Sequence, residues 1–326
     1  MKAQSLIPLA ATAALITSAA ASVTIDYVSV GHAGNVADPG TGSLYGAVAY
    51  AYQIGKYEVT NAQYGAFLNA ADPDGANANG VYNSLMGSNS RGGITYTPGA
   101  ASGQKYTLRA NMGNKPVNYV SWYDSARFTN WMHNGQGTGS TEIGAYTLSG
   151  NTGTITKNVG ATVYIPSEDE WFKAAYYDPT GGGDNYWTYP TQSNTAPTVA
   201  SANFTAGDIT NPGANVANYN YGVDWNDLDG NVTTVGSAAA NNYFGTFDQG
   251  GNVREWNDAL PKSPARGLRG GAWNSSADLL RSSARSYGPP SDELASIGFR
   301  VASVPEPTSL FLTMLASGVM LIRRKR

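Results

Sequence analysis

The alternation of apolar and polar residues follows a helical period in only a few segments of the chain. In residues 59–72, Tyr64, Phe67 and Leu68 recur at the i, i+3, i+4 spacing of one helix face. Thr60 precedes this run and is a residue type that caps helix starts. We therefore predict a short amphipathic helix here.

Two further segments carry both a helical period and a start signal. Residues 120–135 place Ser121 directly before the periodic run. Residues 165–179 give the clearest case, because Ser167 and Glu170 have the spacing of a capping box. Together with residues 59–72, these segments predict three helices.

The stretches between these segments show no sustained period. Residues 72–114, 134–160 and 178–215 are rich in polar residues, Gly and Asn, which predicts long loops with short strands. The composition agrees, since the chain has 39 Gly and 21 Tyr but only 13% charged residues. Loops of this length in a compact domain need something to hold them, and bound cations are one means.

The two ends of the chain are predicted to be targeting segments. Residues 1–21 combine a lysine, an apolar run and small residues, the order of an export signal, so cleavage is expected before Ser22. A buried apolar helix is the alternative for this end. Residues 304–326 hold Pro-Glu-Pro, a 15-residue uncharged stretch too short to span a bilayer easily, and a basic tail. This order resembles the PEP-CTERM sorting signal, which implies exosortase processing and surface release in a Gram-negative bacterium. A plain membrane anchor is the alternative for that end.

Charge and cysteine content exclude several functions. The whole chain has 20 basic and 23 acidic residues, and removing both ends leaves 15 and 22, a net charge of −7. A nucleic-acid partner is not expected, because phosphate binding needs a basic face. With no cysteine, the chain has neither thiolate catalysis nor thiolate metal ligands.

The stretch FDQGGNVREW, residues 247–256, sets two carboxylates around a Gly-Gly-Asn bend. One interpretation is an ordinary turn entering a strand, since Gly and Asn tolerate positive φ. The other is a calcium site made of carboxylates and backbone carbonyls.

Six ordered segments together resemble one known family. They are residues 52–70 (YQIGKYEVTNAQYGAFLNA), 114–132 (NKPVNYVSWYDSARFTNWM), 164–178 (YIPSEDEWFKAAYYD), 245–257 (GTFDQGGNVREWN), 268–273 (LRGGAW) and 297–302 (IGFRVA). This series is similar to the formylglycine-generating enzyme, or sulfatase-modifying factor, family. The resemblance implies a single α+β domain over residues 50–303, irregular, loop-rich and C-type-lectin-like, after a lead-in strand region at 22–49.

The resemblance implies structural calcium. The first family site maps to the side chains of Asp248 and Glu255 and the carbonyls of Gly251 and Val253. Asp248 stands where the family usually has Asn, so it adds a negative charge.

A second family site maps less directly. It takes the side chains of Asn218 and Asp229 and the carbonyls of Tyr219 and Asn231, with Asn203 as a rival for the first position.

The family's copper chemistry is not expected here. Ser275 stands at the first cysteine position and Leu280 near the second, and neither suits soft Cu(I). His32 and His133 are expected to be surface or capping residues, too few for the three-histidine iron site of other members. The acidic run at 167–170 is explained by helix capping, and Arg269 and Arg300 are expected to be structural hydrogen-bond donors.

The sequence therefore predicts an exported, calcium-stabilised binding or matrix domain, with a polysaccharide or a surface protein as partner. Aromatic residues in the loops could stack on sugars or could belong to the core; they are Tyr186, Trp187, Tyr189 and Trp225. The alternative function is an enzyme of the same superfamily with a different, oxygen-ligand chemistry.

Overall fold

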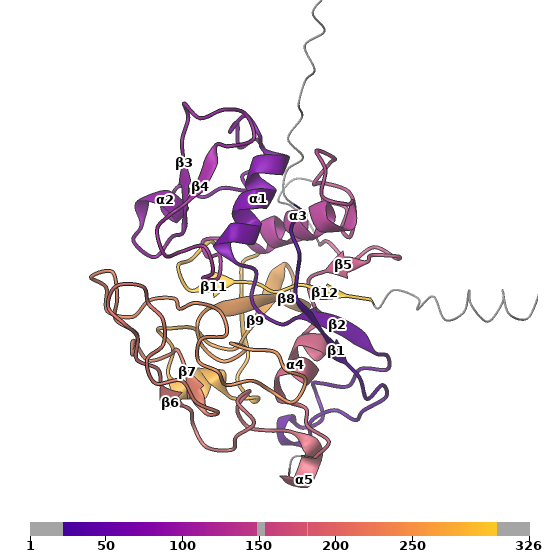
Figure 1. Ribbon diagram of the computed structural model, residues 1–326. Helices are drawn as coiled ribbons and strands as arrows, with labels where there is room; N and C mark the ends of the chain where they lie inside the picture. The colour runs from indigo at the N-terminus through magenta and orange to yellow at the C-terminus, as the bar shows by residue number, and fades with distance from the viewer. Residues whose placement is uncertain (1–21, 149–153, 181, 305–326) are drawn as a thin grey trace, which may run out of the picture.

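The computed structural model describes residues 22–148, 154–180 and 182–304 (Figure 1). The predicted export signal and the stretch after residue 304 lie outside these residues. Within the described part of the chain, no helix is long and apolar enough to cross a membrane.

The three predicted helices are confirmed. They are α1 (Asn61–Ala71), α3 (Trp122–His133) and α4 (Glu168–Tyr176). Each begins at a capping box, with Thr60, Ser121 and Ser167 as the N-caps. The side-chain oxygen of each N-cap accepts the backbone N–H three residues later, which satisfies a donor that the helix itself leaves unpaired.

Two four-stranded sheets form the centre of the domain. The first has the order β1-β2-β12-β5, with β1 (Tyr27–Val30), β2 (Tyr52–Gly55), β12 (Ala302–Ser303) and β5 (Val163–Tyr164). The second has the order β10-β9-β8-β11, with β10 (Ser286–Gly288), β9 (Ala265–Arg269), β8 (Arg254–Lys262) and β11 (Ile297–Gly298). The last described strand, β12, thus pairs with the early strand β2 and with β5, and closes the domain.

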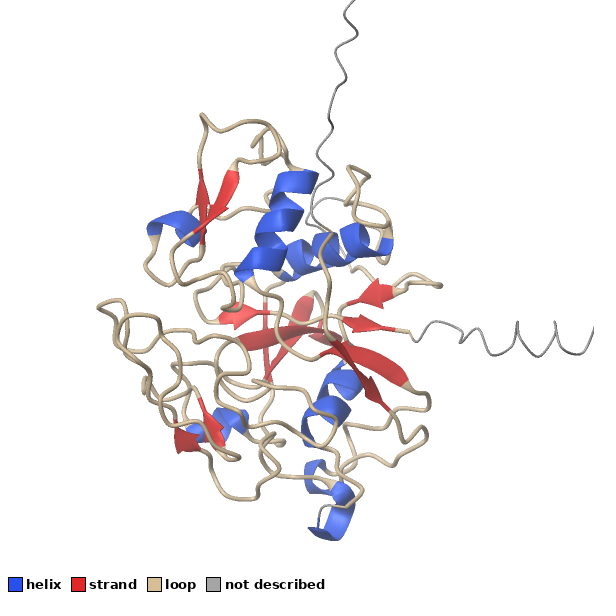
Figure 2. Cartoon of the chain, in the orientation of Figure 1, coloured by secondary structure: helices blue, strands red, loops and turns tan. Residues whose placement is uncertain are grey.

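The long polar stretches contain only short elements. These are the helices α2 (Leu85–Ser88) and α5 (Gly182–Asn185), the 3₁₀ turns η1 (Pro39–Thr41) and η2 (Ala277–Leu280), the antiparallel pair β3 (Ile94–Tyr96) and β4 (Tyr106–Leu108), and the parallel pair β6 (Thr198–Val199) and β7 (Val216–Ala217). Figure 2 shows loops dominating the region below the central sheets. The fold is therefore α+β, irregular and loop-rich, as predicted.

An aromatic core joins the helices to the sheets. Figure 1 shows α1 and α3 on one side of the sheets and α4 on the other. Phe67 of α1 and Phe128 of α3 meet at a ring distance of 5.5 Å, and Phe128 packs at 5.4 Å against Phe299, which follows β11. Edge-to-face contacts of this kind fix the helices against the C-terminal strands.

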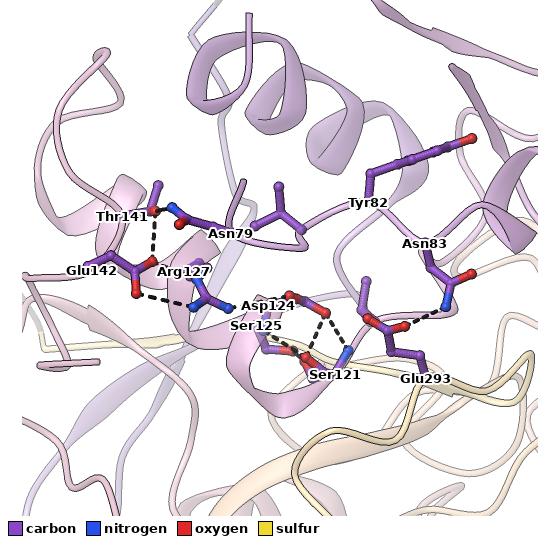
Figure 3. Close-up of polar contacts among 12 residues, drawn as sticks. Asn79, Tyr82, Asn83, Ser121, Asp124, Ser125, Arg127, Thr141, Glu142 and Glu293 are labelled. Atoms are coloured by element: carbon purple, nitrogen blue, oxygen red, sulfur yellow. Dashed lines mark hydrogen bonds and ion pairs between the residues drawn. The ribbon is translucent and has the colours of Figure 1, made fainter. Parts of the chain in front are cut away.

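A polar cluster lies where the start of α3 comes near Asn83 and Glu293, which precedes β11 (Figure 3). The buried Asp124 accepts hydrogen bonds from Ser121 N (2.9 Å) and Ser121 Oγ (2.6 Å), and Arg127 Nη1 lies 3.8 Å away. Asn83 donates to the nearby Glu293 carboxylate. Desolvation raises the pKa of Asp124 to about 8, opposed by the Ser121 hydrogen bond and reinforced by the charge of Glu293.

Candidate functional site

The bend between Asp248 and Glu255 is built from left-handed backbone positions. The φ angles are 59° at Asp248, 93° at Gly251 and 56° at Asn252. A Cβ added at Gly251 would lie 2.3 Å from the carbonyl oxygen of Asn218, so only glycine fits. Asn252 N donates to that same oxygen at 2.8 Å. The bend is therefore fixed against the segment that carries the second predicted calcium site.

Glu255 is fully buried and has several hydrogen-bond donors around it. Arg300 Nε donates to its Oε2 at 2.6 Å and Arg300 Nη2 to its Oε1 at 2.7 Å, so the ion pair is bidentate. Trp171 Nε1, on α4, also donates to Oε2 at 2.7 Å. Arg300 further donates to the carbonyl oxygens of Gly55 and Phe247, at 2.9 and 2.8 Å. The expected structural role of Arg300 is confirmed.

Two more carboxyl groups lie close to this ion pair. Asp248 Oδ2 accepts from Gly236 N, and desolvation raises the pKa of Asp248 to about 6. Glu58 is only 1% exposed, and its Oε2 accepts from Asn252 Nδ2 at 3.3 Å. Its Oε1 has no hydrogen-bond partner among the described residues. Desolvation, and then the charges of Asp248 and Glu255, raise the pKa of Glu58 well above its usual range.

Glu58 was not predicted as a site residue, and the local sequence carries no periodic signal for it. Tyr52 and Ile54 face the core from β2, but Lys56 at the next alternate position is only half-buried, so the two-residue alternation does not extend to Glu58. A buried charged residue is rarely left without a partner.

These four side chains set three carboxyl groups against one guanidinium. Asp248, Glu255 and Glu58 carry up to three negative charges, and Arg300 supplies a single positive one. In residues 22–148, 154–180 and 182–304, no three His, Asp or Glu side chains are arranged to hold a metal by themselves. The predicted site needs no such arrangement, because half of its ligands are backbone carbonyls.

The structure brings together part of the second predicted site. Asn218 Nδ2 donates to the carbonyl oxygen of Asn231 at 2.8 Å. The buried Asn218 Oδ1 accepts no hydrogen bond from any described residue. The rival Asn203 uses its Oδ1 to accept from Ala206 N at 2.6 Å, which closes a local turn. The geometry therefore favours Asn218 as the residue with a spare oxygen.

The structure gives less support to Asp229 as a ligand of that site. Asp229 is exposed, and its backbone carbonyl accepts a hydrogen bond from Arg91 Nη2 at 2.8 Å. Arg91 also stacks on Trp273, at 4.2 Å from the ring centroid. Arg91 and Trp273 thereby hold the Asp229 loop against the domain.

Ser275 and Leu280, expected at the first and near the second cysteine position of the family, have structural roles here. Ser275 is buried, and its Oγ accepts from Ala272 N at 2.9 Å. Leu280 is fully buried beside Tyr189 and Tyr219. Both side chains stabilise the loop after β9 and face away from solvent.

The remaining predicted residues are structural. His133 ends α3 and contacts Thr162 Oγ1 at 2.8 Å, and His32 lies among the rings of Tyr177, Tyr243 and Phe244. Glu168 at the start of α4 pairs with Arg269 at 2.7 Å.

Of the two interpretations of the loop aromatics, the structure favours the core for three residues. Tyr186, Tyr189 and Trp225 are buried, whereas Trp187 is half-buried. The three buried rings are therefore part of the packing and are not available for sugar stacking.

The fold and the site define the class of protein. It is an α+β domain with long loops, in which a glycine-asparagine bend packs beside a buried carboxylate cluster and holds the loops. The chain belongs to the sulfatase-modifying factor enzyme 1-like domain family, whose model matches residues 43–304.

Solved structures share this fold. The Treponema denticola variable protein 1 matches with a TM-score of 0.50 and 20% identity, covering 88% of this chain and 98% of that one. The structure of CarF matches with a TM-score of 0.53 and 19% identity, over 87% and 99% of the two chains. Likeness at this identity shows the fold alone. No curated protein matches the chain.

Proposed function

We propose that this protein is an exported, non-catalytic binding or matrix domain, stabilised by calcium. The observation that carries the non-catalytic part is the chemistry at the two cysteine positions of the family. Ser275 stands at the expected first position and Leu280 near the second, and the chain has no cysteine that could replace either. Copper held for oxygen activation in this way requires soft thiolate ligands, which oxygen and hydrocarbon groups do not replace.

Calcium is supported by the unbalanced charge of the buried cluster. Three carboxyl groups and one guanidinium leave two negative charges when all are ionised, and one divalent ion would neutralise them. Asp248 and Glu255 would supply side-chain oxygens, and Gly251 and Val253 would supply carbonyls. Glu255 already accepts from Arg300 and Trp171, but a carboxylate has about four acceptor positions, so it retains capacity for an ion.

At the second site, the spare oxygen of Asn218 supports the same ion. Asn218 and Asp229 would contribute side chains, and Tyr219 and Asn231 would contribute carbonyls. Calcium prefers six to eight oxygens, so water would complete both coordination spheres.

Location and partners follow from the ends of the chain. The export signal and the PEP-CTERM-like end support transit through the inner membrane, exosortase processing and release to the cell surface or the extracellular matrix. A polysaccharide or a surface protein is the partner class for a domain placed there.

Metal binding and turnover test the proposal together. Isothermal titration should detect calcium and no tight, redox-active iron or copper. Incubation with Cu(I), oxygen and a cysteine-bearing sulfatase peptide should give no aldehyde above a no-protein control. Turnover that Ser275→Ala abolishes would instead support the enzyme alternative and contradict the proposal.

A further inference from the structure

A surface cavity of about 310 Å³ lies apart from the carboxylate cluster. Four segments distant in sequence line it: the first turn of α1, the chain after β4, the loop at 204–208, and Thr234. Its walls include Ala62, Leu108, Asn114, Lys115, Ala206 and Asp208. The volume falls at the small end of ligand pockets, which run from about 300 to 1,000 Å³.

A buried lysine fixes the base of this cavity. Lys115 is 1% exposed, and its Nζ donates to the carbonyl oxygens of Asn111 (2.8 Å) and Ala206 (2.6 Å) and to Thr234 Oγ1 (3.3 Å). The ammonium also lies 4.5 Å from the ring centroid of Trp225. Three segments are thereby held by one side chain, so the cavity is pre-formed.

The charges around the cavity compensate each other. All three ammonium protons of Lys115 are used inside the protein, so none remains to clamp an anion. Thr234 Oγ1 donates to Asp208 Oδ1 at 2.7 Å, which links the lysine to an exposed carboxylate of opposite sign. A single carboxylate beside an ammonium is a poor site for a metal ion. The cavity therefore suits an uncharged ligand.

The exposed groups of the cavity lining are both polar and apolar. Asp208 and Asn114 are exposed and offer planar acceptors and donors, and one hydrogen bond to Thr234 leaves the carboxylate further acceptor positions. Leu108 is 47% exposed, and Ala62 and Ala206 add small apolar surfaces. A pyranose ring presents the complementary pattern, with hydroxyl groups at its edge and C–H groups on its faces.

We propose that this cavity binds one neutral sugar unit, a hexose or an N-acetylhexosamine, within a polysaccharide. The inference deepens the proposed binding function and rests on it. It places recognition at Asp208 and Asn114, supported by the base that Lys115 and Thr234 build, and it assigns no role to the buried aromatic residues.

The test uses the full-length protein and a panel of neutral, acidic and amino sugar oligosaccharides, with affinities measured by titration. Neutral oligosaccharides should bind, and Asn114→Ala and Asp208→Ala should each weaken them at least about tenfold. Ala62→Trp, which fills the cavity, should abolish binding. Asp278→Ala is the matched control, because that carboxylate is 84% exposed and far from the cavity lining in sequence.

Asn114→Ala leaves every contact of Lys115 in place, so it separates recognition from folding. Binding of neutral sugars that all three cavity variants retain would overturn the cavity assignment and leave the binding function standing. Preference for acidic sugars or for cationic, non-acetylated amino sugars would overturn the neutral-ligand assignment. If no oligosaccharide binds the folded protein, the inference is overturned. The proposed function is tested separately, and it would be contradicted by turnover of the sulfatase peptide.

Discussion

Removal of calcium should lower the melting temperature of the protein. The size of this drop should depend on the buried carboxyl groups of the cluster, Glu58 among them. A ligand that binds only the folded state at about one hundred times its Kd stabilises by about 2.7 kcal/mol. For a domain somewhat above 250 residues, each kcal/mol shifts the melting temperature by roughly 2–4 °C, so chelation should cost about 5–11 °C. Asp248→Ala should lower the melting temperature in calcium, and chelation should then cause a smaller further drop, which belongs to the second site.

Glu58→Gln gives a sharper comparison. Without calcium, the substitution should be nearly neutral or stabilising, because the wild-type protein must keep this buried carboxyl group protonated. With calcium, the variant should lose part of the stabilisation, because one compensating negative charge is gone. The control is Asp278→Asn, whose side chain is 84% exposed.

The pH dependence of the melting temperature predicts the direction in which the calcium effect should change. Asp248 has a folded pKa of about 6, above its unfolded value of about 3.9, so without calcium its contribution to stability is present at low pH and is lost as pH rises from about 4 to about 6. Calcium binds the ionised form, so the gap between calcium and chelator melting curves should widen over that range. Scanning calorimetry from pH 4 to 8 measures it. A gap that is absent, or constant across this range, would refute the reasoning.

Three further predictions concern other parts of the chain. Glu255→Gln should destabilise the fold by about 3–5 kcal/mol, measured by urea denaturation, because it breaks the bidentate, fully buried ion pair with Arg300; a loss under 1 kcal/mol would contradict the importance of this pair. Asp124, with a folded pKa of about 8, contributes stability that is lost as pH rises from about 4 to about 8, so Glu293→Gln should flatten this fall in melting temperature, and an unchanged slope would count against the coupling. Mass spectrometry of the exported protein should find an N-terminus near Ser22 and a C-terminus near residues 304–307, and recovery of an intact Arg326 would contradict the processing.

The features that could be predicted from the sequence are local ones. The capping boxes at Ser121 and Ser167 involve residues three positions apart, so a short window contains the whole signal. The same is true of the left-handed bend at Gly251, which sequence composition alone suggests. The fold was predicted from the six segments taken together, because their order along the whole chain resembles that of one family.

Features that depend on distant segments could not be predicted in this way. Glu58 lies 190 residues from Asp248, and only the folded chain makes them neighbours. The sequence left open whether the loop aromatics Tyr186 and Trp225 are exposed or buried, and in the folded chain both are buried. Burial of these residues is decided by tertiary packing, which composition does not report.

Asn252 connects the two predicted ion sites through its hydrogen bonds. Its backbone N–H binds the carbonyl oxygen of Asn218, its Oδ1 accepts from Asn218 Nδ2 at 3.3 Å, and its Nδ2 donates to Glu58. An ion that orders one site therefore orders the amide that positions the other. Occupancy of the two sites should be thermodynamically linked, with each ion raising the affinity for its neighbour by the same factor. The domain would then respond to calcium over a narrower concentration range than two independent sites allow.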